Sequence, residues 1–288
     1  MKPLFSDVKS LLKNSIYVKE IVSKDLSDQF HFHNAFEIAL ILNGRGRRIV
    51  GDSLDSFSNG DLILLAPNLP HVSYSGKKYH IKETGFKVHA IVVYFQPDWI
   101  VDNHLNSSDF APIKKLLDRL KRGIKITGNT HNIVVNHLME LRNADGLKSF
   151  IILFQILYAI CNSNDFSFLA SVRYSNTYSA HDIKKIDEVY KYVMENFTQK
   201  ISLENIAGIV YMTPTAFCKY FKKKTNKTFT YFVNEIRISN ACELLLNENL
   251  DISNICYQCG FNNFTTFNKN FKQIMKITPS EYRLKFPH

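Results

Sequence analysis

The feature that most constrains this 288-residue chain is a repeat in its C-terminal half. The first copy contains Leu203, Ile206, Ala207, Val210, Phe217, Phe221 and Lys222, and the second contains Ile252, Ile255, Cys256, Cys259, Phe267, Phe271 and Lys272. Early positions recur with an offset of 49 (203 to 252) and later ones with an offset of 50 (217 to 267), so one residue is added near Gly260. Two copies of one short pattern indicate two copies of one supersecondary unit.

Capping residues predict that each copy is a helix-turn-helix unit. Ser202 and Asp251 can cap the first helix of each copy through a side-chain oxygen. Thr213, followed by Pro214 at the first helical position, can cap the second helix of copy one. In copy two, Gly260 can adopt the positive φ of a tight turn, and Asn262 or Asn263 can then cap the second helix. Thr278-Pro279-Ser280-Glu281 predicts a capping box that opens a short last helix.

The second helix of each copy is expected to place one polar face in the major groove of double-stranded DNA. Phenylalanines four residues apart should face the core and leave side chains that can reach bases or phosphates on the outside. The predicted DNA contacts are Thr213, Thr215, Cys218, Lys219, Lys222, Asn263, Phe264, Thr265, Asn268, Lys269 and Lys272. A connecting helix over 229–247, about 30 Å long, would suit successive grooves, which lie about 34 Å apart.

The charge distribution agrees with a polyanionic partner. The net charge is +10, and the segments Thr213–Lys224 and Asn263–Lys276 carry lysines but no acidic residue. Solvated helix faces usually mix both signs, whereas phosphate contact requires clustered cations.

Residues 183–285 resemble the DNA-binding domain of the AraC/XylS family of transcription regulators. The matching residues are Ile206-Ala207, Phe217 through Phe221-Lys222, Ile236-Arg237, Ala241, Leu244-Leu245, Ile255, Gly260-Phe261, Phe267, Phe271-Lys272, Thr278-Pro279 and Tyr282-Arg283. The resemblance implies base reading by Thr215, Cys218, Lys219, Phe264, Thr265, Asn268 and Lys269. It departs from the family pattern at Cys256, where Ala is usual, and at Lys219 and Lys269, where Arg is common. Lysine lacks the bidentate fork of arginine, so base reading there should be weaker.

The N-terminal part is expected to be a separate all-β domain followed by helices. Short apolar runs separated by turn residues over 1–100 predict a small barrel or sandwich. Helical periodicity follows over 110–163, and its last helix is apolar enough to require burial on two sides or in a dimer. We therefore expect a small β domain with added helices over 1–164, a linker over 165–180 and the DNA-binding domain over 181–288.

A histidine pattern marks the predicted barrel. His31-x-His33-x₃-Glu37-x₆-Gly44, followed by Gly60-Asp61, Pro67 and Pro70-His71, resembles the two motifs of the cupin barrel, although Leu69 replaces a common Gly. Three interpretations stay open: these polar residues only hold the loops of the barrel mouth, they help bind an organic effector, or they bind a divalent metal. The candidate effector residues are His31, His33, Glu37, Arg45, His71 and Tyr94, and the alternative metal ligands are His31, His33, Glu37 and His71; we expect no resident metal or other cofactor.

Other function classes are disfavoured. Five cysteines argue against a disulfide framework, and Cys256-x-x-Cys259 repeats the core positions Ala207 and Val210. No nucleotide loop, nucleophile elbow or zinc-peptidase motif is present, so we expect no enzyme. No long apolar run or signal peptide is seen, which predicts a cytoplasmic protein.

The resemblance implies a homodimeric activator that senses a sugar or another small metabolite and contacts RNA polymerase. Two rival hypotheses are a cupin-type metal-dependent enzyme and a constitutive DNA-binding protein whose barrel serves only dimerisation.

Overall fold

The computed structural model describes residues 15–24, 26–27, 29–76, 87–96, 108–176, 178–246 and 250–286. The chain divides into two compact units, Met1–Ile183 and Lys184–His288, and each is described by itself. No helix within the described residues is long and apolar enough to cross a membrane.

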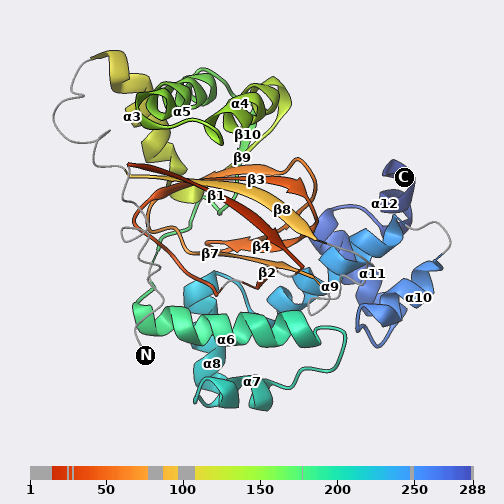
Figure 1. The fold of residues 1–288 in the computed structure, drawn as a ribbon. Helices are drawn as coiled ribbons and strands as arrows, with labels where there is room; N and C mark the ends of the chain where they lie inside the picture. Colours follow the sequence, from red (N-terminus) through yellow and green to blue (C-terminus); the bar gives the residue numbers. More distant parts are fainter. Residues whose placement is uncertain are drawn as a thin grey trace. The chain divides into compact units, whose positions relative to one another are not determined.

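The first unit contains two antiparallel sheets that face each other (Figure 1). The larger sheet has the order β1 (Ile16–Ser23), β8 (Val88–Phe95), β3 (Phe36–Asn43), β6 (Leu62–Leu65), β9 (Ile124–Ile126) and β10 (Phe166–Phe168). The smaller sheet has the order β2 (Leu26–Ser27), β7 (His71–Ser75), β4 (Gly46–Val50) and β5 (Ser53–Phe57). The predicted all-β fold of this part of the chain is thereby confirmed.

Helices cover the outer face of the larger sheet, on the side of β3 and β8 that faces away from the smaller sheet (Figure 1). They are η3 (Ser108–Phe110), α3 (Ala111–Arg119), η4 (Leu120–Arg122), α4 (Gly128–Leu141) and α5 (Gly146–Cys161). Ile38 and Leu40 of β3 share a core with Leu153 and Leu157 of α5. Side chains alternate along a strand, so Glu37, Ala39 and Ile41 point the other way, into the space between the sheets.

The segment expected to be a linker, 165–180, differs from that expectation because much of it packs on the β-sandwich. Phe166–Phe168 forms β10 and pairs with β9. Ser171 then donates hydrogen bonds to the Asp52 carboxylate from its backbone N (2.9 Å) and its hydroxyl (2.6 Å). We call residues 169–176 and 178–179 the strap.

The second unit is helical throughout its described part. Its helices are α6 (Ala180–Asn196), which starts at the end of the strap, α7 (Leu203–Ile209), α8 (Pro214–Thr225), α9 (Phe229–Leu245), α10 (Ile252–Gln258), α11 (Phe264–Met275) and α12 (Pro279–Lys285). The predicted caps are confirmed: Ser202, Thr213, Asp251 and Asn263 each accept a hydrogen bond from a backbone N in the first turn. Thr278 and Glu281 form the predicted capping box.

Candidate nucleic-acid interface and histidine cluster

The two helix-turn-helix units repeat the same turn. In the first, Met212 N donates to Ala207 O (2.9 Å), and in the second, Phe261 N donates to Cys256 O (3.2 Å). The residue just before each donor has a positive φ, +57° at Tyr211 and +84° at Gly260. The extra residue of the second copy follows this turn, because Thr213 caps α8 directly whereas Asn262 precedes the cap Asn263.

The second helix of each unit separates an aromatic inner face from a polar outer face. Phe217 and Phe221 of α8, and Phe267 and Phe271 of α11, are fully buried, as the repeat predicts. Most of the predicted contact residues are exposed: Thr213, Thr215, Cys218, Lys219, Lys222, Asn263, Phe264, Thr265, Lys269 and Lys272; Asn268 is half-buried. Thr213 and Asn263 also serve as caps, so their side-chain oxygens are already engaged.

The lysines of α8 and α11 fall into two groups with different reasons for their presence. Lys222, Lys223 and Lys224 lie in the last turn of α8, and Lys272 lies near the end of α11. Cations near a helix C-terminus stabilise the helix dipole, which is a structural reason for their presence. Lys219 and Lys269 lie further from the helix ends on the exposed face, where that reason is weaker. These two lysines are the more specific sign of a polyanionic partner.

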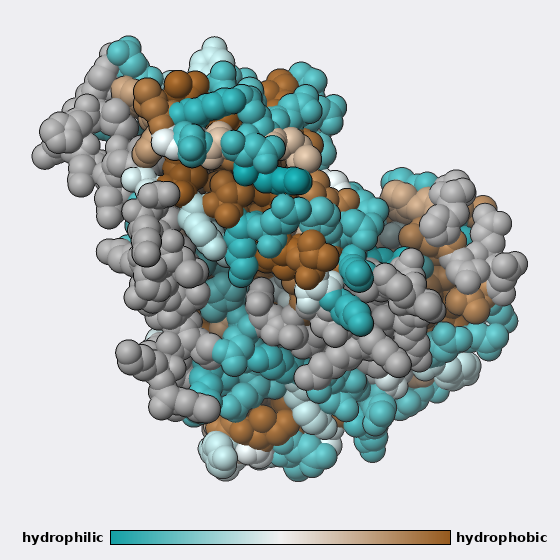
Figure 2. All heavy atoms as spheres, viewed as in Figure 1, coloured by the Kyte–Doolittle hydropathy of each residue, from teal (hydrophilic) through white to brown (hydrophobic). Residues whose placement is uncertain are grey.

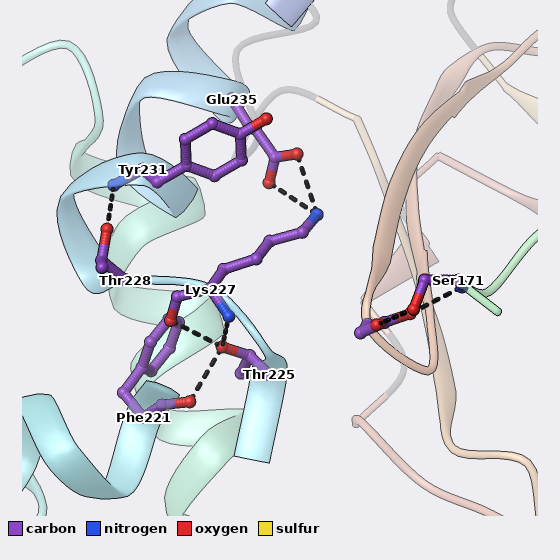
Figure 3. A network of polar contacts seen from close by, with 8 residues as sticks. Ser171, Phe221, Thr225, Lys227, Thr228, Tyr231 and Glu235 are labelled. Atoms are coloured by element: carbon purple, nitrogen blue, oxygen red, sulfur yellow. Dashed lines mark hydrogen bonds and ion pairs between the residues drawn. The ribbon is translucent and has the colours of Figure 1, made fainter. Parts of the chain in front are cut away.

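A polar network fixes the end of α8 to the start of α9 (Figure 3). The Thr225 hydroxyl donates to Phe221 O (2.8 Å), and Lys227 N donates to the same hydroxyl (3.3 Å). The Lys227 ammonium then contacts both oxygens of Glu235, each at 2.8 Å, with both side chains largely buried. No sequence pattern marks this pair, because the two residues lie eight positions apart across a helix start.

The second recognition helix is tied to the same scaffold. Asn234 of α9 donates to Asn270 of α11 (2.9 Å). Arg283 of α12 donates to the backbone oxygens of Leu245 (3.3 Å) and Leu250 (2.6 Å). Both recognition helices are therefore anchored to α9 by polar contacts in addition to their aromatic cores.

In the first unit the structure brings together His31, His33, Glu37 and His71. A pair of backbone hydrogen bonds joins His31 to His71 (3.0 and 2.8 Å), and Glu37 is the second residue of β3. Glu37 Oε2 lies 2.9 Å from His33 Nε2 and 3.3 Å from His71 Nε2. One ring nitrogen from each histidine lies within 4.8 Å of the others.

Each histidine ring in this cluster is oriented by a backbone carbonyl. The Nδ1 atoms of His31, His33 and His71 lie 2.7, 3.0 and 2.8 Å from the backbone oxygens of Gln29, Ala35 and Leu69. A carbonyl oxygen only accepts, so each Nδ1 carries the proton and donates it. The Nε2 atoms of His33 and His71 face the carboxylate, and each presents an N–H to it in the charged ring or a lone pair in the neutral ring.

Burial shapes the charges in this cluster. Burial and the neighbouring His71 lower the pKa of His31 to about 3. Burial opposes ionisation of Glu37, but the charge of His71 and the contact with His33 outweigh it and hold its pKa well below the ordinary value. The cluster therefore combines an ionised carboxylate with at least one neutral imidazole.

Of the remaining candidate effector residues, Tyr94 adjoins the cluster and Arg45 does not. Tyr94 pairs with Glu37 in the sheet register, and its ring centroid lies 5.2 Å from that of His33. Arg45 is exposed and comes two residues after Asn43, the last residue of β3. Asn43 lies six residues beyond Glu37, or roughly 20 Å along the strand. The expectation that Arg45 shares a site with the histidines is not met.

Comparisons with known proteins agree with this architecture. Residues 206–285 match a helix-turn-helix domain family. The chain is 22% identical over 263 residues to the HTH-type transcriptional activator RhaR of Mannheimia succiniciproducens, covering 89% of this chain and 87% of that one. It is 23% identical over 256 residues to the lactose operon transcription activator of Staphylococcus xylosus, covering 86% and 83%.

A third relative matches only the second unit. The regulatory protein PocR of Salmonella typhimurium is 34% identical over 103 residues, or 36% of this chain and 34% of PocR. The double helix-turn-helix geometry and the regulators that match it agree on the function of this unit. The chain is a DNA-binding transcription regulator, and its second unit is similar to the helix-turn-helix domains of these regulators.

Proposed function

We propose that this regulator is a homodimeric, effector-responsive activator that reads successive major grooves with α8 and α11 and contacts RNA polymerase. The observation that carries the proposal is the pair of recognition helices, each with a buried aromatic face and an exposed lysine-bearing face without acidic residues. Connecting helix α9 has 17 residues, so it is about 26 Å long, near the 34 Å of one DNA turn. The relatives named as activators support activation over repression.

The strap supplies a route from the histidine cluster to the DNA-binding domain. Asn68 N donates to His33 O (2.8 Å), and Asn176 of the strap donates to Asn68 O (2.6 Å). Tyr178 packs edge-on against Phe30, which precedes His31 (5.5 Å between centroids). Ser179 then caps α6 through mutual hydrogen bonds with Asp182. A ligand that moves the loops bearing His33 and His71 would thus move the segment that starts α6.

An effector is expected to stabilise the protein and to change its affinity for DNA. A screen of the full chain against sugars, sugar acids and other small metabolites should give a rise in melting temperature. A ligand at 100 times its Kd adds about 2.7 kcal/mol of stability. The same ligand should change operator affinity, because it must prefer one of two arrangements to act as an effector.

Asn176→Ala tests the route through the strap. This variant should keep the ligand-induced rise in melting temperature but lose the ligand-induced change in operator affinity, measured by fluorescence anisotropy. A screen without any stabilising ligand would favour the alternative in which the barrel serves only dimerisation. If Asn176→Ala keeps the full ligand-induced change in operator affinity, the strap does not transmit the effect of the ligand.

Helix α5 offers the dimer surface. Its inner face is buried in the core, yet Leu147, Ile151 and Tyr158 on the outer side are 76%, 53% and 68% exposed. In Figure 2, apolar residues gather over the helical layer that contains α5. A helix that is apolar all round is normally buried, so we assign this stripe to a second copy of the chain.

The double variant Leu147→Lys/Ile151→Lys is expected to be monomeric, because two buried charges would oppose association. Sedimentation velocity of the full chain measures this directly. Leu284→Lys, which places the same charge on an exposed apolar residue of α12, should stay dimeric. A native chain that sediments as a monomer at micromolar concentration, or a double variant that remains dimeric, would contradict the assignment.

A further inference from the structure

A small cavity lies between the two helix-turn-helix units of the DNA-binding domain. Its volume is about 160 Å³. Its walls come from three places: the start of α7 with the residues just before it, the first half of α9, and the turn before α11. The polar residues of the lining are Lys200, Thr230, Asn234, Arg237 and Asn262. Both helix-turn-helix units therefore contribute to one cavity.

Arg237 fixes the loop that leads into α7. Its Nε donates to Phe197 O and its Nη2 donates to Gln199 O, each at 2.8 Å. The turn at Gly260 approaches the same loop, since a Cβ added there would lie 2.6 Å from Phe197 O. The loop before α7 and the turn before α11 are thereby held together at the cavity.

The cavity has an excess of positive charge. Lys200 and Arg237 are its two cations, and none of its lining residues is acidic. Neither cation pairs with a carboxylate among the described residues: Lys200 is exposed, and half-buried Arg237 donates to backbone oxygens. Removing a cation from water without a counter-charge costs free energy, and an anion in the cavity would offset that cost.

The backbone of α9 adds to this preference. Phe229 and Thr230 are the first two residues of this 17-residue helix, and both line the cavity. The N–H groups at a helix start and the positive end of the helix dipole favour anions, phosphate groups in particular. The Thr230 hydroxyl and the Asn262 amide are exposed at the cavity and can donate to the same anion.

The position of the cavity identifies the source of the anion. In helix-turn-helix proteins the first helix crosses the DNA backbone, while the recognition helix enters the major groove. The start of α7, which is the first helix of copy one, lines the cavity. Asn262, which precedes the cap of recognition helix α11, lines it as well. A backbone segment that leaves one recognised groove and enters the next would pass between these two places.

We propose that this cavity binds one phosphate of the DNA backbone between the two recognised grooves, through Lys200, Arg237 and the first N–H groups of α9. Such a contact carries no sequence information, but it fixes the register of both recognition helices on the duplex. The proposal rests on the proposed reading of two successive major grooves. It adds an anchoring point that lies outside both recognition helices.

Lys200→Gln tests the site in the full chain, because Lys200 is exposed and its replacement leaves the fold intact. On DNA that the native protein selects from a random-sequence pool, affinity near 0.1 M salt should fall about 5- to 10-fold. The slope of log affinity against log salt should fall in magnitude by about 1, equally for selected and mismatched DNA. Lys285→Gln removes an exposed lysine at the end of α12 and should change affinity less than about twofold.

A neutral methylphosphonate, placed at one phosphate at a time, locates the contact. For the native protein, a neutral linkage between the two recognised grooves should weaken binding about 5- to 10-fold. For Lys200→Gln the same linkage should cost less than about twofold, because its charged partner is already absent. Neutral linkages elsewhere in the DNA should weaken both proteins equally.

Unchanged affinity and salt slope in Lys200→Gln would overturn the phosphate site. A scan in which no linkage between the grooves distinguishes the two proteins would overturn it as well. Failure of the proposed two-groove reading looks different, because Lys269→Ala alone would then leave DNA affinity unchanged whatever Lys200→Gln does.

A second arm without DNA separates a backbone phosphate from a free one. Inorganic phosphate is compared with sodium chloride of equal ionic strength by the melting temperature of the full chain. We expect no difference between the two salts, because a free phosphate lacks the groove contacts that bring the DNA phosphate to the cavity. Stabilisation by phosphate that Lys200→Gln abolishes, together with unchanged DNA affinity of that variant, would assign the cavity to a free phosphorylated molecule and overturn the proposal.

Discussion

Gly260→Ala is expected to destabilise the second unit by roughly 2–5 kcal/mol, because this turn has no room for a methyl group. Gly260 has a φ of +84°, which costs a residue with Cβ about 1–2 kcal/mol. A Cβ there would also lie 2.6 Å from the backbone oxygen of Phe197 and 2.7 Å from that of Thr198. Backbone oxygens cannot move aside as a flexible side chain does, so the turn itself must shift.

Calorimetry of the full chain measures this effect on the unfolding transition of the second unit. For a domain of this size, 1 kcal/mol corresponds to about 4–8 °C, so the melting temperature should fall by at least about 8 °C. Binding of operator DNA should weaken in parallel at temperatures where part of the variant is unfolded.

The repeat provides matched controls for Gly260. Tyr211 occupies the equivalent position of the first copy, has a φ of +57° and is 92% exposed. Tyr211→Gly should therefore be neutral or stabilise by up to about 1 kcal/mol, since glycine adopts this conformation freely. Gly208→Ala, in helix α7 with nothing within 4 Å of the added Cβ, should stabilise by about 0.5–1 kcal/mol.

Opposite signs at Gly260 and Tyr211 would show that the two copies share a turn but differ in what lies against it. If Gly260→Ala has the melting temperature of the native chain, an added Cβ at this position does not clash with the backbone of Phe197 and Thr198. If Tyr211→Gly destabilises as strongly as Gly260→Ala, the strain is not local to the second turn.

The second unit is predictable from sequence because its signals are local. A capping oxygen, a proline at the first helical position and a glycine at a left-handed turn each act within four residues, and Thr213, Pro214 and Gly260 do so here. The repeat then checks each assignment against a second copy. Tyr211 shows the limit of such local signals, because a tyrosine side chain does not favour a positive φ. Only its alignment with Gly260 indicates that conformation.

The first unit is less predictable because its decisive contacts join distant residues. Strands β9 and β10 have three residues each, too few to show alternation, and they form only because β6 presents a free edge to β9. The strap is polar and aperiodic, which is typical of a linker. It nevertheless contacts Asp52 and Asn68, which lie more than 100 positions earlier in the chain. The histidine motif predicts proximity, but not the orientation of the rings, which depends on three backbone carbonyls.

Lys219→Ala/Lys269→Ala is expected to weaken operator binding by at least about 30-fold while leaving the fold unchanged. Each lysine is exposed on its recognition helix, so removal should cost little folding stability. A lost contact to a base edge costs about 1–3 kcal/mol, and two such losses combine to at least about 2 kcal/mol. The measurement is fluorescence anisotropy with DNA that the native protein selects from a random-sequence pool.

The salt dependence of binding separates two roles for these lysines. If both contact phosphates, the slope of log affinity against log salt should fall in magnitude by about 2, and affinity should drop for every DNA sequence. If they contact base edges, the loss should concentrate on selected DNA, and discrimination against mismatched sites should decrease. Lys222→Ala/Lys272→Ala, nearer the helix ends, should give the phosphate result.

A charge-matched control excludes a general loss of positive charge as the cause. Lys115→Ala/Lys121→Ala removes the same two charges from exposed positions of α3 and η4 in the first unit. These residues lie outside both recognition helices, so DNA affinity should change less than about threefold. Equal losses in the two double variants would mean that net charge, and not the outer faces of α8 and α11, governs binding. If both helices lie on the DNA, the single variants Lys219→Ala and Lys269→Ala should each weaken binding, since a single contacting unit would make one of the two lysines dispensable.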